Sequence, residues 1–191
     1  MKIQIKRLSL LVLLVVFFPL GVFAQSEPSQ NNLPSFIEME SKYIDDEKFS
    51  LVFPSIPRRV MFKQILEGQK INIVTYQADD GIGLYTFSIG ALEGILSGEP
   101  ARKSYVEEVF RALFSGAPDG KIYTLEQSSK NPYEISYLYT SVFKGIDWAH
   151  RGMIFLLNEN TYIKITLIYP LEKIEIANEK YSEFLNSLKI K

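Results

Sequence analysis

The sequence predicts an α+β fold in which an antiparallel sheet of about seven or eight strands carries an internal helix and a C-terminal helix packed on it. Short segments with alternating apolar and polar residues dominate the chain from Phe49 onward. Tight turns separate most of these segments, and such turns require antiparallel neighbours. Only 101–114 and 172–188 have long apolar stripes at helical spacing. The helices therefore follow groups of strands, which is typical of α+β proteins.

The first 24 residues (1–24) have the pattern of a secretory signal peptide. A basic start is followed by an apolar run over 8–18 and by a small residue, Ala24, after which cleavage is expected. The alternative is an uncleaved membrane anchor, which would need about 20 apolar residues. We therefore expect a bacterial exported protein, periplasmic or secreted, with no stable membrane insertion after cleavage.

A linker is expected between the signal peptide and the folded domain. Residues 25–35 are rich in Ser, Gln, Asn and Pro, with too little apolar surface to offset the entropy of ordering. Residues 36–191 are then one domain of ordinary size. Its first part, 36–47, is either a short helix or an extended arm that docks on the domain.

The composition excludes several classes of function. Without Lys2, Lys6 and Arg7, 18 basic residues face 22 acidic ones, so the mature net charge is about −4. This balance disfavours a nucleic-acid partner, which usually requires a basic surface. The chain has no Cys and a single His, which leaves no thiol chemistry and no imidazole-rich metal site within one chain.

The folded domain begins with a strand that stops abruptly. Phe49, Leu51 and Phe53 share one face of its period-two pattern, and we expect them in the core. Pro54 and Pro57 then end the strand and turn the chain.

The remaining elements follow from periodicity and turn residues. Further strands are expected at 59–65, 69–77, 83–90, 121–127, 133–143, 148–157 and 161–169. Pro100 suits a first helical position. The expected buried stripes are Tyr105, Val106, Val109, Phe110, Leu113 and Phe114 in the internal helix, and Ile174, Ala177, Tyr181, Phe184, Leu185 and Leu188 in the terminal one.

Three stretches resemble one known fold. The opening F-S-L-V-F-P-S-I-P at 49–57, the strand pair over 148–158 and 161–165, and the ending F-L-N-S-L at 184–188 are similar to the PsbP-like (Mog/PsbP-like) fold found in small exported bacterial proteins. The resemblance covers roughly residues 47–189. Members of this fold perform unlike roles, so its motifs do not indicate a chemistry. What the resemblance implies for this chain, by analogy, is a non-catalytic binding or assembly domain.

Two arginines follow the proline-bounded turn. Arg58 and Arg59 form a basic pair that would suit an anionic partner. The alternative is that they are edge-strand charges, which discourage association between sheets.

A second group of candidate partner-binding residues is Trp148, His150 and Arg151. Asp147 and His150 are the one pairing that would support acid–base chemistry. One histidine without a second catalytic motif is a poor signal, so we favour structural roles, with Trp148 packed in the sheet and His150 half-exposed on the other face.

No motif predicts an enzyme, a cofactor or a metal. The chain lacks G-x-S-x-G, and its acidic turns at 45–47 and 79–81 do not match a calcium loop. Its glycines at 81–83 and 94–98 lack the setting of a phosphate loop.

The aromatic content leaves two functions open. Six Tyr residues lie in the second-half strands: Tyr123, Tyr133, Tyr137, Tyr139, Tyr162 and Tyr169. They suit an interface or pocket, or simply a half-solvated sheet. We expect a non-catalytic domain that binds a protein partner through an exposed sheet face or the loop 91–99. The alternative is a carrier of a small apolar molecule or lipid in a sheet–helix pocket, which a cavity of about 300 Å³ or more would favour.

Overall fold

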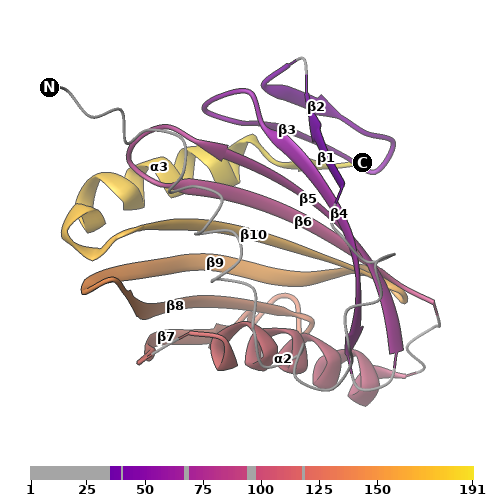
Figure 1. Ribbon diagram of the computed structural model, residues 1–191. Coiled ribbons are helices and arrows are strands. Elements are labelled where there is room, and N and C mark those ends of the chain that lie inside the picture. The colour runs from indigo at the N-terminus through magenta and orange to yellow at the C-terminus, as the bar shows by residue number, and fades with distance from the viewer. Residues whose placement is uncertain (1–34, 40, 67–68, 94–97, 118) are drawn as a thin grey trace, which may run out of the picture.

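The computed structural model describes residues 35–39, 41–66, 69–93, 98–117 and 119–191 (Figure 1). The predicted signal peptide and all but the last residue of the predicted linker lie outside these residues. Ser35, predicted as linker, is the first residue of a strand.

The main sheet has eight strands, all paired antiparallel, in the order β1-β4-β5-β6-β10-β9-β8-β7. Their bounds are β1 Ser35–Glu38, β4 Arg58–Leu66, β5 Gln69–Asp79, β6 Leu84–Leu92, β7 Lys121–Gln127, β8 Glu134–Phe143, β9 Ile146–Asn158 and β10 Thr161–Pro170. The predicted α+β class and antiparallel sheet are confirmed. The strands β4 to β6 form one antiparallel meander and β7 to β10 form another. The two meanders meet in the middle of the main sheet, where β10 pairs with β6.

A second sheet of three strands was not predicted. β3 (Phe49–Val52) lies between β2 (Tyr43–Asp45) and the C-terminal β11 (Lys189–Ile190), and all pairings are antiparallel. The expectation of a single sheet was therefore wrong. β3 takes one of its partners from the far end of the chain, and a periodic pattern does not report such a pairing.

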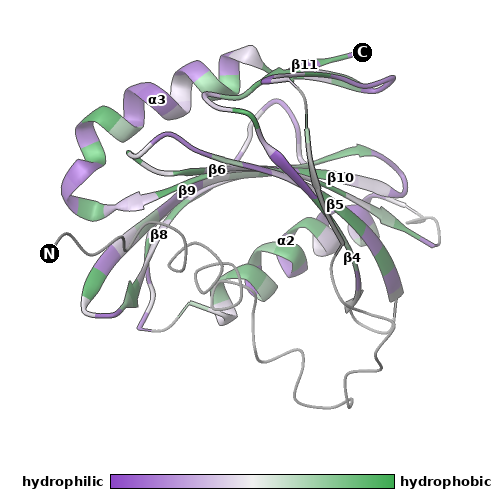
Figure 2. Ribbon diagram, turned by 45° about the horizontal axis from the view of Figure 1, so that its top comes forward, coloured by the Kyte–Doolittle hydropathy of each residue, from purple (hydrophilic) through white to green (hydrophobic). Residues whose placement is uncertain are grey.

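Two helices cover opposite faces of the main sheet (Figure 2). α2 (Glu99–Ser115) contacts β8 and β9 on one face, here called the α2 face. α3 (Ile174–Ser187), which follows a short 3₁₀ turn over Leu171–Lys173, contacts β10 and β3 on the other, the α3 face. Alternate residues of each main-sheet strand therefore point into two different layers.

Each face has its own apolar core. On the α3 face, Phe49, Leu51 and Phe53 are at most 1% exposed and pack with Phe87 and Phe184, which confirms the predicted core strand. On the α2 face, the buried residues of the helix pack against Ile71, Ile73, Ile135, Tyr137, Tyr139, Ile154, Leu156 and Tyr162. Both predicted helical stripes are confirmed as buried or partly buried.

The segment before β3 is extended rather than helical. β1 pairs with the start of β4, so that Ile37 lies opposite Arg59. β4 is thus flanked by β1 and β5, and the prediction that Arg58 and Arg59 are edge-strand charges was wrong. Without β1, β4 would be an edge strand of the main sheet; the pairing with β1 makes it an interior strand.

Candidate functional site

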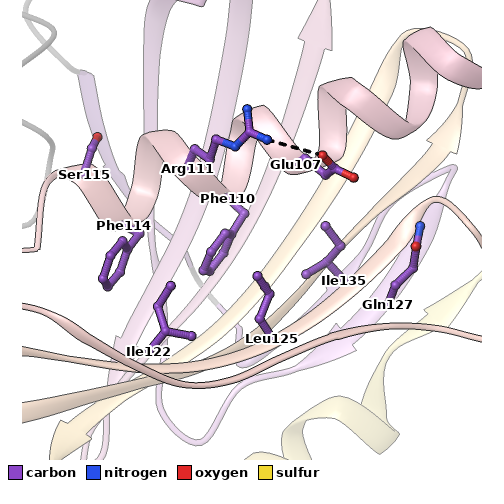
Figure 3. Close-up of a pocket in the computed structure, with 9 residues that line it drawn as sticks. All are labelled: Glu107, Phe110, Arg111, Phe114, Ser115, Ile122, Leu125, Gln127 and Ile135. Atoms are coloured by element: carbon purple, nitrogen blue, oxygen red, sulfur yellow. Dashed lines mark hydrogen bonds and ion pairs between the residues drawn. The ribbon is translucent and has the colours of Figure 1, made fainter.

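An apolar groove opens between α2 and the strands β7 and β8 (Figure 3). Its volume is about 510 Å³. It is lined by Phe110 and Phe114 of α2, by Ile122 and Leu125 of β7, and by Ile135 of β8. Polar side chains, Glu107, Arg111, Ser115 and Gln127, complete the lining.

The helix wall of this groove is held by the buried stripe of α2. Tyr105, Val106 and Val109 anchor the helix on the sheet. Phe110 and Phe114, one turn apart, stack with their ring centroids 6.2 Å apart and their planes at 10°. Phe114 also meets Tyr139 edge-on, at 5.5 Å between centroids. The helix therefore presents a rigid aromatic surface to the groove.

The strand wall depends on a bulge in β7. Ile122 pairs with Tyr139 and Thr124 pairs with Leu138, which leaves Tyr123 as an extra residue between them. A bulge changes the face of the sheet to which the following side chains point. Ile122 and Leu125 are three positions apart and would lie on opposite faces of a regular strand, but the bulge at Tyr123 places both in the groove lining.

β7 is also an edge strand of the main sheet, since within the described chain it pairs only with β8. Its large side chains are unusually exposed: 40% for Ile122, 53% for Tyr123 and 49% for Leu125. Exposed contiguous apolar side chains mark interaction surfaces. An edge strand in addition offers backbone N–H and C=O groups to another chain.

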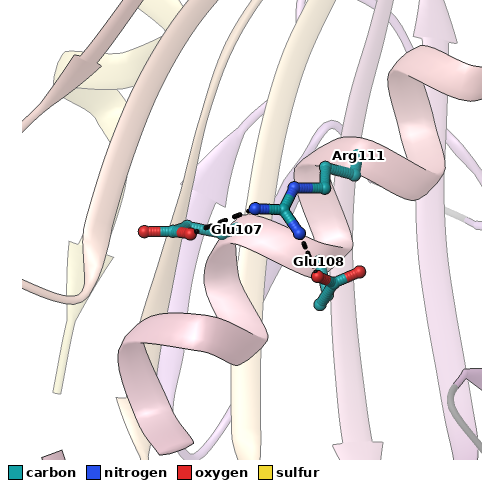
Figure 4. Close-up of polar contacts among 3 residues, drawn as sticks. All are labelled: Glu107, Glu108 and Arg111. Carbon is teal, nitrogen blue, oxygen red and sulfur yellow. Dashed lines mark hydrogen bonds and ion pairs between the residues drawn. The ribbon is translucent and has the colours of Figure 1, made fainter. Parts of the chain in front are cut away.

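Polar side chains define the rim. Arg111 lies 3.5 Å from Glu107 and also donates to Glu108, so its charge is satisfied on the helix surface (Figure 4). Gln127 donates to the carbonyl of Pro132 at 2.6 Å. The groove can thus provide apolar contact with hydrogen bonds at its edge, and its lining residues include no nucleophile–base pair. No cluster of three or more metal-ligating side chains occurs among the described residues.

His150 lies outside the groove and is buried, at 3% exposure. Its ring stacks on Tyr139 at 4.5 Å and 7°, and its Nε2 lies 2.9 Å from Ser141 Oγ. Burial, helped by the charge of Lys164, lowers its pKa to about 3. The prediction that His150 is half-exposed was wrong, because Tyr139 and Ser141 of the neighbouring strand pack against it. The prediction that it lies on the face opposite Trp148 was also wrong, because residues two apart on a strand share a face.

The proposed acid–base pair does not form. Asp147 and His150 are three residues apart on β9, so they point to opposite faces of the sheet. Asp147 is exposed, whereas His150 is buried.

Arg151 of β9 contacts two residues of α3. Its guanidinium donates to Asn178 Oδ1 at 2.5 Å and lies 5.4 Å from the centre of the Tyr181 ring. Both partners belong to α3, so the contacts stabilise the helix on the sheet.

The five predicted partner-binding residues do not form one surface. Arg58 and Arg59 lie at the start of β4, Trp148 and His150 point to the α2 face of β9, and Arg151 lies under α3. The structure describes only part of the predicted binding loop 91–99, because 94–97 are outside the described residues. Sequence reasoning allowed for an apolar sheet–helix pocket but did not name the residues of this groove. The signal in the sequence was that K-I-Y-T-L-E-Q has apolar residues at both strand parities.

No protein-family model matches the chain, and no curated protein matches its sequence. Among the described residues, no helix is long and apolar enough to cross a membrane.

Proposed function

We propose that this protein is an exported, non-catalytic binding domain that takes an extended segment of a protein partner at the β7 edge, with the partner's apolar side chains in the α2–β7 groove. The observation that carries the proposal is the coincidence of an edge strand, three exposed large side chains and an adjoining apolar groove. Strand addition of this kind gains affinity from main-chain hydrogen bonds and specificity from side-chain pockets. The signal-peptide pattern supports a partner in the cell envelope or outside the cell.

The resemblance to the PsbP-like fold supports the same proposal. We assign the domain to that fold on its sequence stretches, and an antiparallel sheet with helices on both faces is compatible with the assignment. What the assignment implies is binding or assembly rather than catalysis.

The second candidate function is transport of a small apolar molecule. It is favoured by one observation, the groove volume of about 510 Å³, which lies within the range of ligand pockets. The groove, however, opens beside an exposed edge strand, β7, and for this reason we favour an extended polypeptide as its ligand over a small apolar molecule.

The test uses the double variant Ile122→Ser with Leu125→Ser, which removes apolar contact without adding charge. The matched control is Ile176→Ser, which changes a side chain of similar exposure, 46%, on α3. Each purified protein is used to capture partners from the native envelope, and a photoreactive residue at Tyr123 then identifies what touches β7. We expect the same partner with the wild type and the control, its loss with the groove variant, and a cross-link at Tyr123.

Two results would contradict the proposal. One is equal capture by the groove variant. The other is a co-purifying small apolar molecule that the groove variant loses while no polypeptide cross-links at Tyr123, which would establish the carrier instead.

A further inference from the structure

The bulge makes the edge strand β7 symmetric about Thr124. Counted along the pairing with β8, Ile122 and Leu125 each lie one position from Thr124. Lys121 and Glu126 each lie two positions from it, on either side. Without the extra residue of the bulge, Ile122 would lie two positions from Thr124 and Leu125 only one, so the symmetry would be lost.

The two faces of β7 follow the same symmetry. Ile122 and Leu125 both line the groove on the α2 face. The intervening positions, Lys121, Thr124 and Glu126, lie on the other face, because neighbouring positions of a strand alternate between faces. From one end to the other, the strand thus presents a base, an apolar side chain, a hydroxyl, an apolar side chain and an acid.

The two charges of β7 are open to a partner. Lys121 and Glu126 are exposed, and within the described part of the chain neither forms an ion pair. The Lys121 ammonium lies 5.1 Å from the centre of the Tyr123 ring on the same strand. Arg111 on the groove rim, in contrast, is already paired with Glu107 and Glu108 of its own helix.

We propose that the partner at the β7 edge is a second copy of this chain, whose β7 pairs antiparallel with this one about a twofold axis at Thr124. The inference rests on the proposed function, because it names the extended segment that this edge takes. Antiparallel pairing reverses the order of the second strand, so each Lys121 lies opposite Glu126 of the other copy. Each Ile122 likewise lies opposite Leu125 of the other copy.

These reciprocal contacts are what favour a second copy over an unrelated strand. Cross-strand pairs of opposite charge and of apolar side chains stabilise a sheet, and the twofold axis provides two pairs of each kind. An unrelated strand would need its own acid and base at the same spacing, whereas a second copy provides them by symmetry.

The second copy also completes the groove. A twofold axis between antiparallel strands is perpendicular to the sheet, so both α2 helices lie on the same face of the joined sheet. Ile122 and Leu125 of the other copy then extend the apolar floor on the open side of the groove. These side chains, 40% and 49% exposed in the single chain, are covered by one another.

The first test measures the mass of the mature protein in solution by analytical ultracentrifugation. We expect a dimer. Glu126→Lys turns attraction into repulsion at two positions and should weaken the dimer by about tenfold or more. Lys121→Glu should have the same effect. Lys130→Glu, in the exposed β7–β8 connection, is the matched control and should dimerise as the wild type does.

Mixing the two charge variants tests the reciprocity of the pairing. In a heterodimer of Glu126→Lys with Lys121→Glu, every base again lies opposite an acid. The mixture should therefore dimerise although each variant alone does so weakly. Recovery on mixing also demonstrates that both variants are folded.

The second test determines the register by disulfide formation, since the chain has no cysteine of its own. Thr124→Cys places two thiols opposite each other at the axis, where the Cα atoms are about 5 Å apart, and mild oxidation should link them. Glu126→Cys alone should not link, because its two copies lie about 14 Å apart, four positions along the strands. Mixed with Lys121→Cys, it should form a disulfide.

Three results would overturn the second copy as partner. These are a monomeric wild type at its highest soluble concentration, a dimer that Glu126→Lys leaves intact, and a disulfide that forms equally with Thr124→Cys and Glu126→Cys. The photoreactive residue at Tyr123 tests the proposed function separately. A cross-link there to a different polypeptide excludes the second copy and retains the proposed function, whereas no cross-linked polypeptide contradicts both.

Discussion

Phe53 and Phe184 pack ring against ring, with centroids 5.1 Å apart, although they come from opposite ends of the domain. Phe53 follows β3 and Phe184 belongs to α3. Ser187 reinforces the junction, since its hydroxyl donates to the carbonyl of Val52 at 3.2 Å. The C-terminal helix thus closes the core that the first strands begin.

This junction predicts a large loss of stability for Phe53→Ala. Phe53 is 1% exposed, and truncating a buried phenylalanine leaves a cavity in addition to the lost apolar burial. We expect the free energy of unfolding to fall by about 3–5 kcal/mol, measured by denaturant titration. Val52→Ala, at a neighbouring position that is 47% exposed, should change it by no more than about 0.5 kcal/mol. Equal effects of the two variants would refute the packing described here.

A second prediction concerns Gly90, which makes room for Tyr162. An added Cβ at position 90 would lie 2.0 Å from a ring carbon of Tyr162. Gly90→Ala should therefore displace the ring and destabilise the protein by about 1–3 kcal/mol in thermal or denaturant unfolding. In a double-mutant cycle with Tyr162→Ala, the combined loss should be smaller than the sum of the single losses. Strict additivity would show that the ring is not what resists the methyl group.

A third prediction is a pH dependence that originates at His150. Its pKa is about 3 in the folded protein, against 6.5 ordinarily. Between these values the unfolded chain binds the proton and the folded chain does not, so stability is highest above pH 6.5 and falls as the pH decreases toward 3. The slope should approach about 1.4 kcal/mol per pH unit.

The measurement compares the wild type with His150→Gln from pH 7 to 5, above the range in which most carboxylates titrate. The variant should lose most of this slope. Because Lys164 also lowers the pKa of His150, Lys164→Met should raise that pKa, so that the loss of stability ends at a higher pH when the titration is continued below pH 5. Parallel stability curves for the wild type and His150→Gln would assign the pH dependence to other groups.

A fourth prediction follows from the buried hydrogen bond between Tyr137 and Thr166. Tyr137→Phe leaves the Thr166 hydroxyl without this partner, which should cost about 1–3 kcal/mol in denaturant unfolding. Thr166→Val should cost a similar amount. The double variant removes both polar groups and should cost less than the two single changes together. A double variant as unstable as that sum would mean that the bond contributes nothing.

Local patterns were a good guide to the elements and to their apolar faces. The alternation of Phe49, Leu51 and Phe53 predicted a core strand, and all three are buried. The helical stripes ending at Phe114 and at Leu188 were also confirmed. These predictions succeeded because strand and helix periods depend only on residues a few positions apart.

Long-range pairings could not be predicted in the same way. Nothing in the sequence of β3 indicates that it pairs with β11. Nothing in the sequence around Arg59 indicates that β1 pairs with its strand, β4. The exposure of His150 was predicted wrongly because it depends on Tyr139 and Ser141 from a neighbouring strand. The α2–β7 groove depends on a bulge at Tyr123, which changes strand parity in a way that periodicity does not show.

The sequence by itself thus determined the α+β class, the antiparallel turns and the buried stripe of each helix. Only the tertiary structure decided that α2 and α3 cover opposite faces, that β7 is left at an edge beside a groove, and that His150 is buried against Tyr139. The reason is physical: periodicity states which side chains avoid water, whereas burial, pairing and charge compensation depend on residues that folding brings from elsewhere in the chain.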